Sequence, residues 1–143
     1  MTTLEQVPVA DGLFTWPSAT PQLIGGHCTE CSGWHFPVQA NCPHCAGRAI
    51  ARTPLSRRGT LWTWTLQTFA PPVPPYRGPV ENFVPFGVGY VELPEGLRVQ
   101  GRLTVNDAAR LKIGMTMELI LEPWRVDEQG RQVMGFAFAP ASP

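Results

Sequence analysis

Five segments in the second half of the chain read as β-strands, because apolar or aromatic residues recur at close to every second position in most of them. They are Leu61–Phe69, Phe86–Leu93, Leu97–Leu103, Met115–Leu121 and Gln132–Phe138. The turn residues at Pro94–Gly96 join the second and third segments into a hairpin, and Asp127–Gly130 makes a turn before the last. The second half is therefore predicted to be a β unit of five strands.

A short helix interrupts this series of strands. Asn106 or Asp107 can cap it, Ala108–Leu111 form its body, and Gly114 ends it. The order of three strands, one short helix and two strands is the plan of a five-stranded OB-fold barrel, with the helix between strands three and four. We therefore predict a mostly β protein with an OB-fold over residues 51–143.

Four cysteines stand as two C-x-x-C pairs, Cys28/Cys31 and Cys42/Cys45, and the chain has no others. Each pair can place two thiolates on one metal from a tight turn, and the ten residues Ser32–Asn41 are enough for a hairpin between the pairs. Small residues just after each pair leave backbone amides free to point at sulfur: Ser32, Gly33, Ala46 and Gly47. The pattern predicts a rubredoxin-like zinc ribbon over residues 27–50.

Four thiolates saturate a tetrahedral zinc ion, so the metal is expected to be structural. Disulfides would need an oxidising compartment, and Met1–Gly12 carries no secretory signal pattern. We therefore expect a cytoplasmic protein with reduced cysteines, with a redox or iron site as the alternative. The neighbouring His27, His35 and His44 are predicted to be surface or hairpin residues rather than ligands.

Composition argues against two classes of partner. The 143 residues include 11 basic and 11 acidic side chains, and only 15% are charged. A nucleic-acid binder usually needs a basic excess to displace phosphate counterions. No stretch approaches the roughly 18 apolar residues of a membrane span. The sequence thus predicts neither a nucleic-acid nor a membrane partner.

Residues 1–26 lack clear periodicity and are expected to form an N-terminal docking arm with one short helix. Pro8, Pro17 and Pro21 interrupt this segment. Its apolar side chains either cover the edge of the ribbon or dock on a partner. Phe14 and Trp16 are the candidate docking residues.

A proline-rich loop, Ala70–Pro85, joins the first two strands by about sixteen residues, when hairpin loops usually have roughly two to five. Proline lowers the entropy lost on ordering, so the loop can present Tyr76, Arg77 and Phe83 to a partner. The alternative is a polyproline stretch lying over the barrel.

Several motifs resemble those of the acyl-CoA-associated zinc-ribbon/OB-fold family, also known as domain of unknown function thirty-five. The most specific are Phe36-Pro37 after the first knuckle, Gly59-Thr60 opening the first strand, Val91-Glu92-Leu93 and Ile113-Gly114-Met115. The likeness covers about residues 23–138. Family members typically carry a second proline and an arginine after Phe-Pro, where this chain has Val38-Gln39.

The resemblance implies a non-catalytic accessory subunit of a thiolase-superfamily enzyme. Its partner would be a thiolase-like subunit or a lipid-transfer-protein-like aldolase that removes steroid side chains as CoA thioesters. In such a hetero-oligomer, the ribbon and arm would dock on the catalytic subunit, with the acyl-CoA substrate near the interface. An acetoacetyl-CoA-type thiolase is the alternative partner.

The residues themselves also point away from catalysis. The cysteines are used by metal, no G-x-S-x-G motif is present, and the carboxylates fall mostly in turns or on outer strand faces. Glu92 is the least ordinary, since Val91 and Leu93 flank it. Two other functions stay open: a single-strand nucleic-acid module that would stack bases on Trp62, Trp64 and Phe69, and an acyl-CoA carrier that would use Arg57, Arg58 or Arg77.

Overall fold

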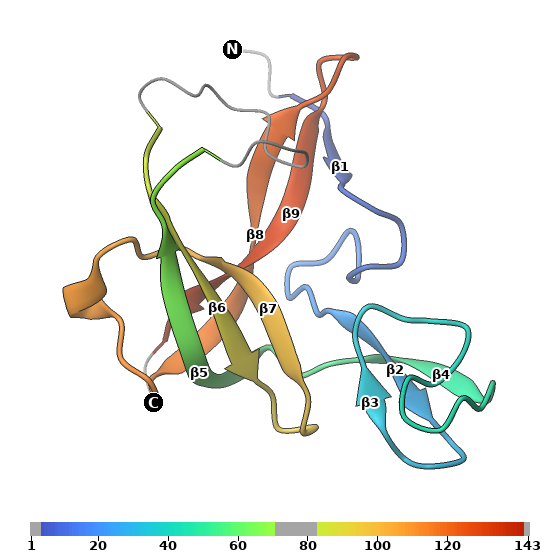
Figure 1. Ribbon diagram of the computed structural model, residues 1–143. Helices are drawn as coiled ribbons and strands as arrows, with labels where there is room; N and C mark the ends of the chain where they lie inside the picture. The colour runs from blue at the N-terminus through green and yellow to red at the C-terminus, as the bar shows by residue number, and fades with distance from the viewer. Residues whose placement is uncertain (1–3, 71–82, 142–143) are drawn as a thin grey trace.

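The structure is a computed structural model that describes residues 4–70 and 83–141. Strands account for nearly all the regular structure of these residues (Figure 1). The elements are β1 Gln6–Pro8, β2 Ile24–Cys28, β3 Trp34–His35, β4 Ile50–Pro54, β5 Arg58–Gln67, β6 Phe86–Glu92, β7 Arg98–Leu103, the 3₁₀ helix η1 Ala108–Arg110, β8 Thr116–Val126 and β9 Gln132–Pro140. The predicted mostly β class is confirmed.

Strands β5 to β9 form a closed barrel of five strands. They hydrogen-bond in the order β5-β6-β7-β9-β8, and β8 pairs with β5 through residues 116–118 and 58–60, which closes the ring. β7 and β9 run parallel, and the other neighbours in the ring are antiparallel. This is the predicted OB-fold.

Alternation along these strands fills the barrel with apolar side chains. The burial pattern of β7 switches between exposed and buried at every residue, because successive side chains of a strand point to opposite faces. The buried core includes Leu61, Val91, Leu93, Val99, Leu103, Met117, Leu119, Phe136 and Phe138. The hydrophobic pattern therefore sets both the strands and the interior of the barrel.

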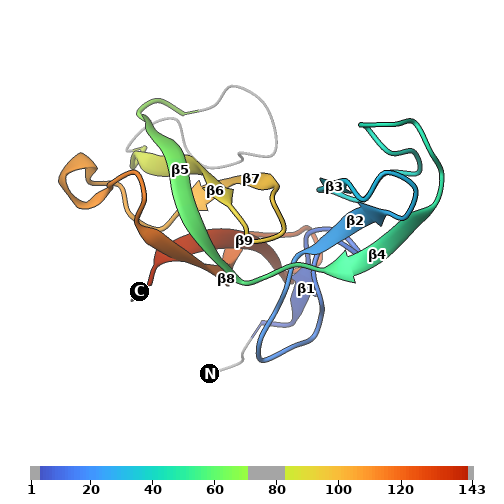
Figure 2. The same ribbon diagram turned by 90° about the horizontal axis from the view of Figure 1, so that it is seen from below.

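The ribbon is a separate three-stranded sheet that lies to one side of the barrel in both Figure 1 and Figure 2. β2 is its middle strand and pairs antiparallel with β3 and β4. Residues 24–28 pair with residues 50–54. The sheet therefore extends beyond the predicted 27–50 range on both sides.

The N-terminal segment contributes a strand and core residues. β1 pairs in parallel with residues 132–134 of β9, and Phe14 bridges Leu23. Phe14 is 3% exposed and Leu23 is 1% exposed. The expected short helix is wrong for residues 4–26, which contain strands, a bridge, turns and bends but no helix. The prolines of this segment disfavour a helix.

A set of contacts at residues 55–57 fixes the ribbon against the barrel. Leu55 is fully buried, and its carbonyl accepts a hydrogen bond from the Gln22 side chain at 3.1 Å. Arg57 donates to the carbonyls of Pro21 and Leu119, at 2.9 and 3.1 Å. These bonds hold the N-terminal segment, the linker and β8 together, so the ribbon has a defined orientation.

A second contact joins residues 55–57, which link the ribbon to the barrel, to the turn between β6 and β7. The Glu95 carboxylate accepts hydrogen bonds from the backbone N–H and the hydroxyl of Ser56, at 2.8 and 2.9 Å. Across the interface, Phe36 of the ribbon packs edge-on against Phe136 of the barrel, with ring centroids 5.8 Å apart. Both contacts place the ribbon against the barrel.

The predicted helix is a single 3₁₀ turn, η1. The Asp107 side chain caps it by accepting a hydrogen bond from the N–H of Ala109 at 2.9 Å.

β8 and β9 are longer than predicted and form a hairpin that extends past the barrel (Figure 1). Near its tip, the Trp124 ring lies where a Cβ atom on Gly135 would be.

We predict that Gly135→Ala lowers the free energy of unfolding by about 1–3 kcal/mol, because the new methyl group displaces the Trp124 ring. Urea unfolding followed by circular dichroism measures this. The matched background is Trp124→Ala, in which the same glycine replacement should cost much less. Equal costs in both backgrounds would contradict this packing.

Candidate metal centre and partner surfaces

Two identical backbone turns present the four cysteines. In the first, Cys28 accepts from the N–H of Ser32 at 2.8 Å and donates to the carbonyl of Gly33 at 2.9 Å. In the second, Cys42 accepts from Ala46 at 2.8 Å and donates to the carbonyl five residues on at 2.7 Å. The small residues after each pair form the turn, and the N–H groups of Gly33 and Gly47 point at the second sulfur of each pair, which is the role the sequence predicted.

The four sulfurs converge on a single point. All four lie within 4.8 Å of one another, and both the Cys28–Cys45 and Cys31–Cys42 sulfur pairs are 3.6 Å apart. Sulfurs around a tetrahedral zinc ion with bonds of about 2.3 Å lie about 3.8 Å apart. A disulfide would bring them to about 2.0 Å, so the geometry fits a metal and not two disulfides.

Backbone amides surround the sulfurs as second partners. His44 N–H donates to Cys42 Sγ and Gly47 N–H donates to Cys45 Sγ, each at 3.4 Å. Such N–H···S bonds stabilise thiolate charge and orient the ligands. The turns thus position the ligands and also favour their ionised form.

Four thiols this close cannot all ionise without a cation. Burial raises the pKa of Cys42, but hydrogen bonds from the backbone N–H groups of His44 and Cys45, together with those from the Cys31 and Cys45 thiols, lower that pKa to about 6. For Cys45, the N–H of Gly47 lowers the pKa, but the neighbouring Cys28 and Cys31 thiols raise it to about 12. A divalent ion removes this mutual repulsion.

The three histidines near the cluster are occupied elsewhere, as predicted. The His44 ring nitrogen Nε2 lies 3.1 Å from the Trp34 carbonyl, and the His27 ring stacks on Trp34 with centroids 4.1 Å apart. His35 Nε2 accepts a hydrogen bond from the N–H of Gln39 at 3.1 Å. His35 is only 6% exposed, so it is a buried hairpin residue and not a surface one.

The candidate docking residues have different environments. Phe14 belongs to the core, where its ring lies 6.2 Å from that of Trp16, and Trp16 is half-buried against the same core. Phe83 is half-buried, with its ring 5.8 Å from that of Phe86. Tyr76 and Arg77 lie outside the described residues. The docking role of Trp16 and Phe83 stays a prediction, whereas Phe14 packs inside the chain.

Exposed aromatic side chains lie on the outer face of the barrel. Trp62 is 46% exposed and meets Tyr90 edge-on at 6.2 Å. The Arg98 guanidinium lies 3.9 Å from the Trp62 ring centroid, and its Nε is 3.0 Å from a Glu92 carboxylate oxygen. Glu92 is exposed, so it lies on an outer strand face as expected for most of the carboxylates. Arg98, which lies beside the Trp62 and Tyr90 rings, is paired with Glu92. It therefore offers little free positive charge to bind phosphates.

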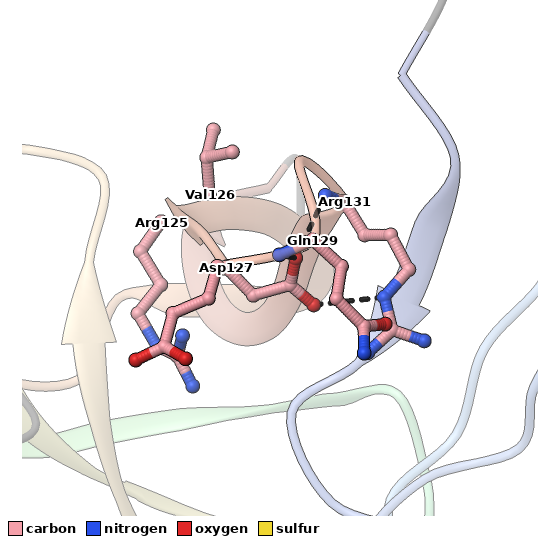
Figure 3. Close-up of a pocket in the computed structure, with 6 residues that line it drawn as sticks. Arg125, Val126, Asp127, Gln129 and Arg131 are labelled. Carbon is pink, nitrogen blue, oxygen red and sulfur yellow. Dashed lines mark hydrogen bonds and ion pairs between the residues drawn. The ribbon is translucent and has the colours of Figure 1, made fainter.

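A pocket at the tip of the β8–β9 hairpin is lined by residues 125–129 and Arg131 (Figure 3). Its carboxylate Asp127 is used by the turn itself. Asp127 accepts hydrogen bonds from the backbone N–H groups of Gln129 and Arg131, at 3.0 and 2.8 Å, and from Arg131 Nε at 2.8 Å. The Arg131 N–H is the main cause of the lowered pKa of Asp127. This carboxylate is therefore used to close the predicted 127–130 turn.

Sequence reasoning missed Glu122, which is half-buried on β8. Burial raises the pKa of its carboxyl group, although the nearby Arg102 opposes this, with Nε 3.4 Å from the carboxylate. The two residues reach each other across β9. Only the three-dimensional order β7-β9-β8 brings them together, so no local sequence signal could reveal the pair.

No helix in the part of the chain that the structure describes could span a membrane.

We predict about one zinc ion per chain, with sulfur bonds of about 2.3 Å. Cys42→Ser removes one ligand, so the purified variant should lose zinc and the ribbon should unfold while the barrel stays folded. Elemental analysis and NMR spectra of the two regions measure this. His44→Ala is the matched control and should keep its zinc. A metal-free wild-type chain with four free thiols would contradict this assignment.

Comparison with known families agrees with this geometry. Residues 16–51 match the family described as ChsH2, rubredoxin-like zinc ribbon domain, and residues 52–121 match ChsH2, C-terminal OB-fold domain. The predicted structural zinc is confirmed by the first match together with the four converging cysteines.

Individual relatives cover most of the chain. A DUF35 domain-containing scaffold protein from Pyrococcus furiosus is 32% identical over 120 residues, 83% of each chain. Benzoylsuccinyl-CoA thiolase subunit BbsA from Thauera aromatica is 34% identical over 101 residues, 66% of this chain and 65% of that one.

A solved structure described as Ltp2-ChsH2(DUF35) aldolase has the same fold. Its TM-score is 0.63 at 24% identity, and the match covers 85% of this chain and 86% of that chain. The two domain matches run from residue 16 to residue 121, and the archaeal relative aligns over 83% of both chains. The chain therefore belongs to the ChsH2-type family of DUF35 proteins, in which a zinc ribbon precedes an OB-fold.

Proposed function

We propose that this chain is a non-catalytic accessory subunit of a thiolase-superfamily acyl-CoA enzyme and acts in the cytoplasm, where its cysteines stay reduced for zinc. The relatives support this by their names, which are a scaffold protein and a thiolase subunit. The subunit would stabilise its catalytic partner in a hetero-oligomer and help to shape the entrance for CoA and substrate.

The observation that carries this proposal is that the chain's reactive groups are already engaged in holding its own structure. The four cysteines converge on one metal and leave it no open position for water or substrate. Glu92 pairs with Arg98, and Glu118 lies 3.5 Å from Arg58. Within residues 4–70 and 83–141, we find no nucleophile beside a base and no pair of carboxylates poised for acid/base work.

We further propose that the complex is a retro-aldolase that cleaves a steroid side chain as its CoA thioester. The aromatic first strand of the barrel and the proline-rich loop suit a large apolar substrate or interface. An acetoacetyl-CoA-type thiolase partner is the second candidate, and the thiolase subunits among the relatives favour it. A nucleic-acid function has less support, because Arg98 and Arg102 both face carboxylates.

The purified chain alone should turn over no acyl-CoA thioester. Mixed with a thiolase-superfamily subunit from the same genome, it should form a hetero-oligomer whose interface exceeds about 1,000 Å² and includes aromatic anchors. Light scattering and activity assays on the isolated and combined proteins measure both. Robust lyase or thiolase activity of the isolated chain would overturn the accessory role.

The two candidate reactions differ in their need for free CoA. Thiolytic cleavage consumes one CoA for each 3-oxoacyl-CoA, whereas retro-aldol cleavage of a 3-hydroxyacyl-CoA consumes none. Cleavage by the complex without added CoA supports the aldolase. A strict requirement for free CoA would instead identify a thiolase.

The proline-rich loop gives a second prediction for the complex. If it lines the CoA entrance, Arg77→Ala should raise KM for the CoA substrate and make KM less sensitive to salt, because a screened attraction to phosphate is lost. Arg110→Ala, an exposed arginine on η1, is the matched control.

Replacing Tyr76, Arg77 and Phe83 together should weaken catalysis by the complex with little change in stability, because surface loops carry few core contacts. Unchanged kcat and KM of this triple variant in a normally assembled complex would remove the loop from the entrance.

A further inference from the structure

Among the residues that the structure describes, the far end of β5 has no strand partner on one side. On the side away from β6, β5 pairs with β8 only through residues 58–60. One more pair of bonds follows at Leu61, whose N–H donates to Met115 at 2.9 Å and whose carbonyl accepts from Gly114 at 2.8 Å. Beyond it, residues 63–67 pair with β6 on one side, and no strand in the described part of the chain pairs with the other.

A bulge marks the start of this free edge. The register with β6 shifts between Leu61 and Thr63 and is then regular from Thr63 to Gln67. We refer to residues 63–67 as the β5 free edge. About five residues is the length of an average strand, so the edge is long enough to pair with another one. Every second residue of it directs an N–H and a C=O outward.

Other open edges in the described residues carry features that discourage pairing. β1 has three residues and ends in Pro8, and β3 has two residues. β4 contains Arg52 and ends in Pro54, and β7 begins with Arg98. The far half of β8 carries Glu122, Pro123 and Arg125, with a register shift at the proline.

Beyond the bulge at its start, the β5 free edge has none of these protections. Its sequence, T-W-T-L-Q, contains no charge, no proline and no glycine. Trp64 and Leu66 face the core, whereas Thr65 is exposed. An unprotected edge of this kind is a ready template for another strand, and natural proteins keep one only where something pairs with it.

The charge around this edge indicates what kind of strand would pair with it. Trp62 and Tyr90 lie on the adjoining outer face, and the Arg98 beside them is paired with Glu92. Arg102 lies over the Phe86 ring and faces Glu122. The arginines of this outer face are therefore paired on the chain itself. A charged side chain of the incoming strand that lay against this face would lose its hydration without gaining a partner, so an uncharged segment fits best.

We infer that the β5 free edge accepts an extended, uncharged segment of the thiolase-like partner as an added β-strand. The inference rests on the proposed accessory function and specifies how the partner docks. Main-chain hydrogen bonds to residues 63–67 supply the binding, and the exposed Trp62 and Thr65 contact the side chains of the incoming strand.

Hydrogen exchange of the edge amides tests this directly. The probe is a thiolase-superfamily subunit from the same genome, added to the full chain. Edge amides within residues 63–67 should exchange quickly in the free chain and on the order of tenfold more slowly, or slower still, in the complex, because they become hydrogen-bonded. Amides of β7 are already hydrogen-bonded to β6. A change in their exchange rate therefore measures general effects of complex formation and not strand addition. Unchanged exchange at the edge in a formed complex would overturn the inference.

A matched pair of variants provides a second test. Thr65→Lys places a charge on the free edge, whereas Thr60→Lys places the same charge on the same strand where β8 already covers the edge; both positions are exposed. Thr65→Lys should raise the dissociation constant about tenfold or more, and Thr60→Lys should change it about twofold at most. Equal effects would contradict strand addition.

Two further outcomes are distinguished by the same experiments. If Tyr90→Ser weakens binding while Thr65→Lys does not, the outer face is the docking site and the edge is not. If the edge amides become protected as the isolated chain is concentrated, its occupant is a second copy of this chain. Failure of every thiolase-superfamily subunit to bind overturns the proposed function and this inference together, whereas binding without edge protection overturns only the inference.

Discussion

The convergence of four thiolates on one metal ion is the constraint on which the ribbon depends. Between residues 27 and 50, the buried side chains are Cys28, His35 and Cys42, so the ribbon has almost no hydrophobic core of its own. Its sheet consists of strands of two to five residues, too short to be stable alone. Metal coordination replaces the missing core. The ribbon's shape, and any surface it offers to a partner, therefore exists only while zinc is bound.

This metal-held unit is joined to the barrel by packing and not by a flexible linker. Leu23 and Leu55 belong to the same buried cluster as the barrel interior, and Arg57 bonds to the segments on both sides. β1 continues the sheet by pairing with β9 at residues that precede those paired with β7. The N-terminal segment is consequently part of the body of the protein. A partner meets ribbon and barrel as one surface, which lowers the entropy lost on docking.

The sequence predicts those features that depend on local pattern or on fixed spacing. The cysteine pairs, the barrel strands, the 127–130 turn and the Asp107 cap all follow from neighbouring residues. Features created by distant pairing were missed. The three residues of β1 have no periodicity and gain their strand structure from β9, and Phe14 becomes a core residue through its bridge to Leu23. The Arg102–Glu122 pair likewise needs β9 between its two strands. Such contacts depend on topology, which short-range pattern does not encode.

The charge distribution limits how this protein can associate. Its 11 basic and 11 acidic side chains cancel, and several of them, including Arg98 and Arg131, are paired on the chain itself. Little long-range field is left to steer a partner, so the rate of encounter should be ordinary and nearly independent of salt. Recognition then has to come from short-range terms, namely apolar contact and backbone hydrogen bonds. Both require close fit over a fixed surface, and both favour complexes that separate slowly rather than ones that form quickly. A zinc-stapled, tightly joined body is suited to that kind of lasting attachment, because its surface keeps one shape.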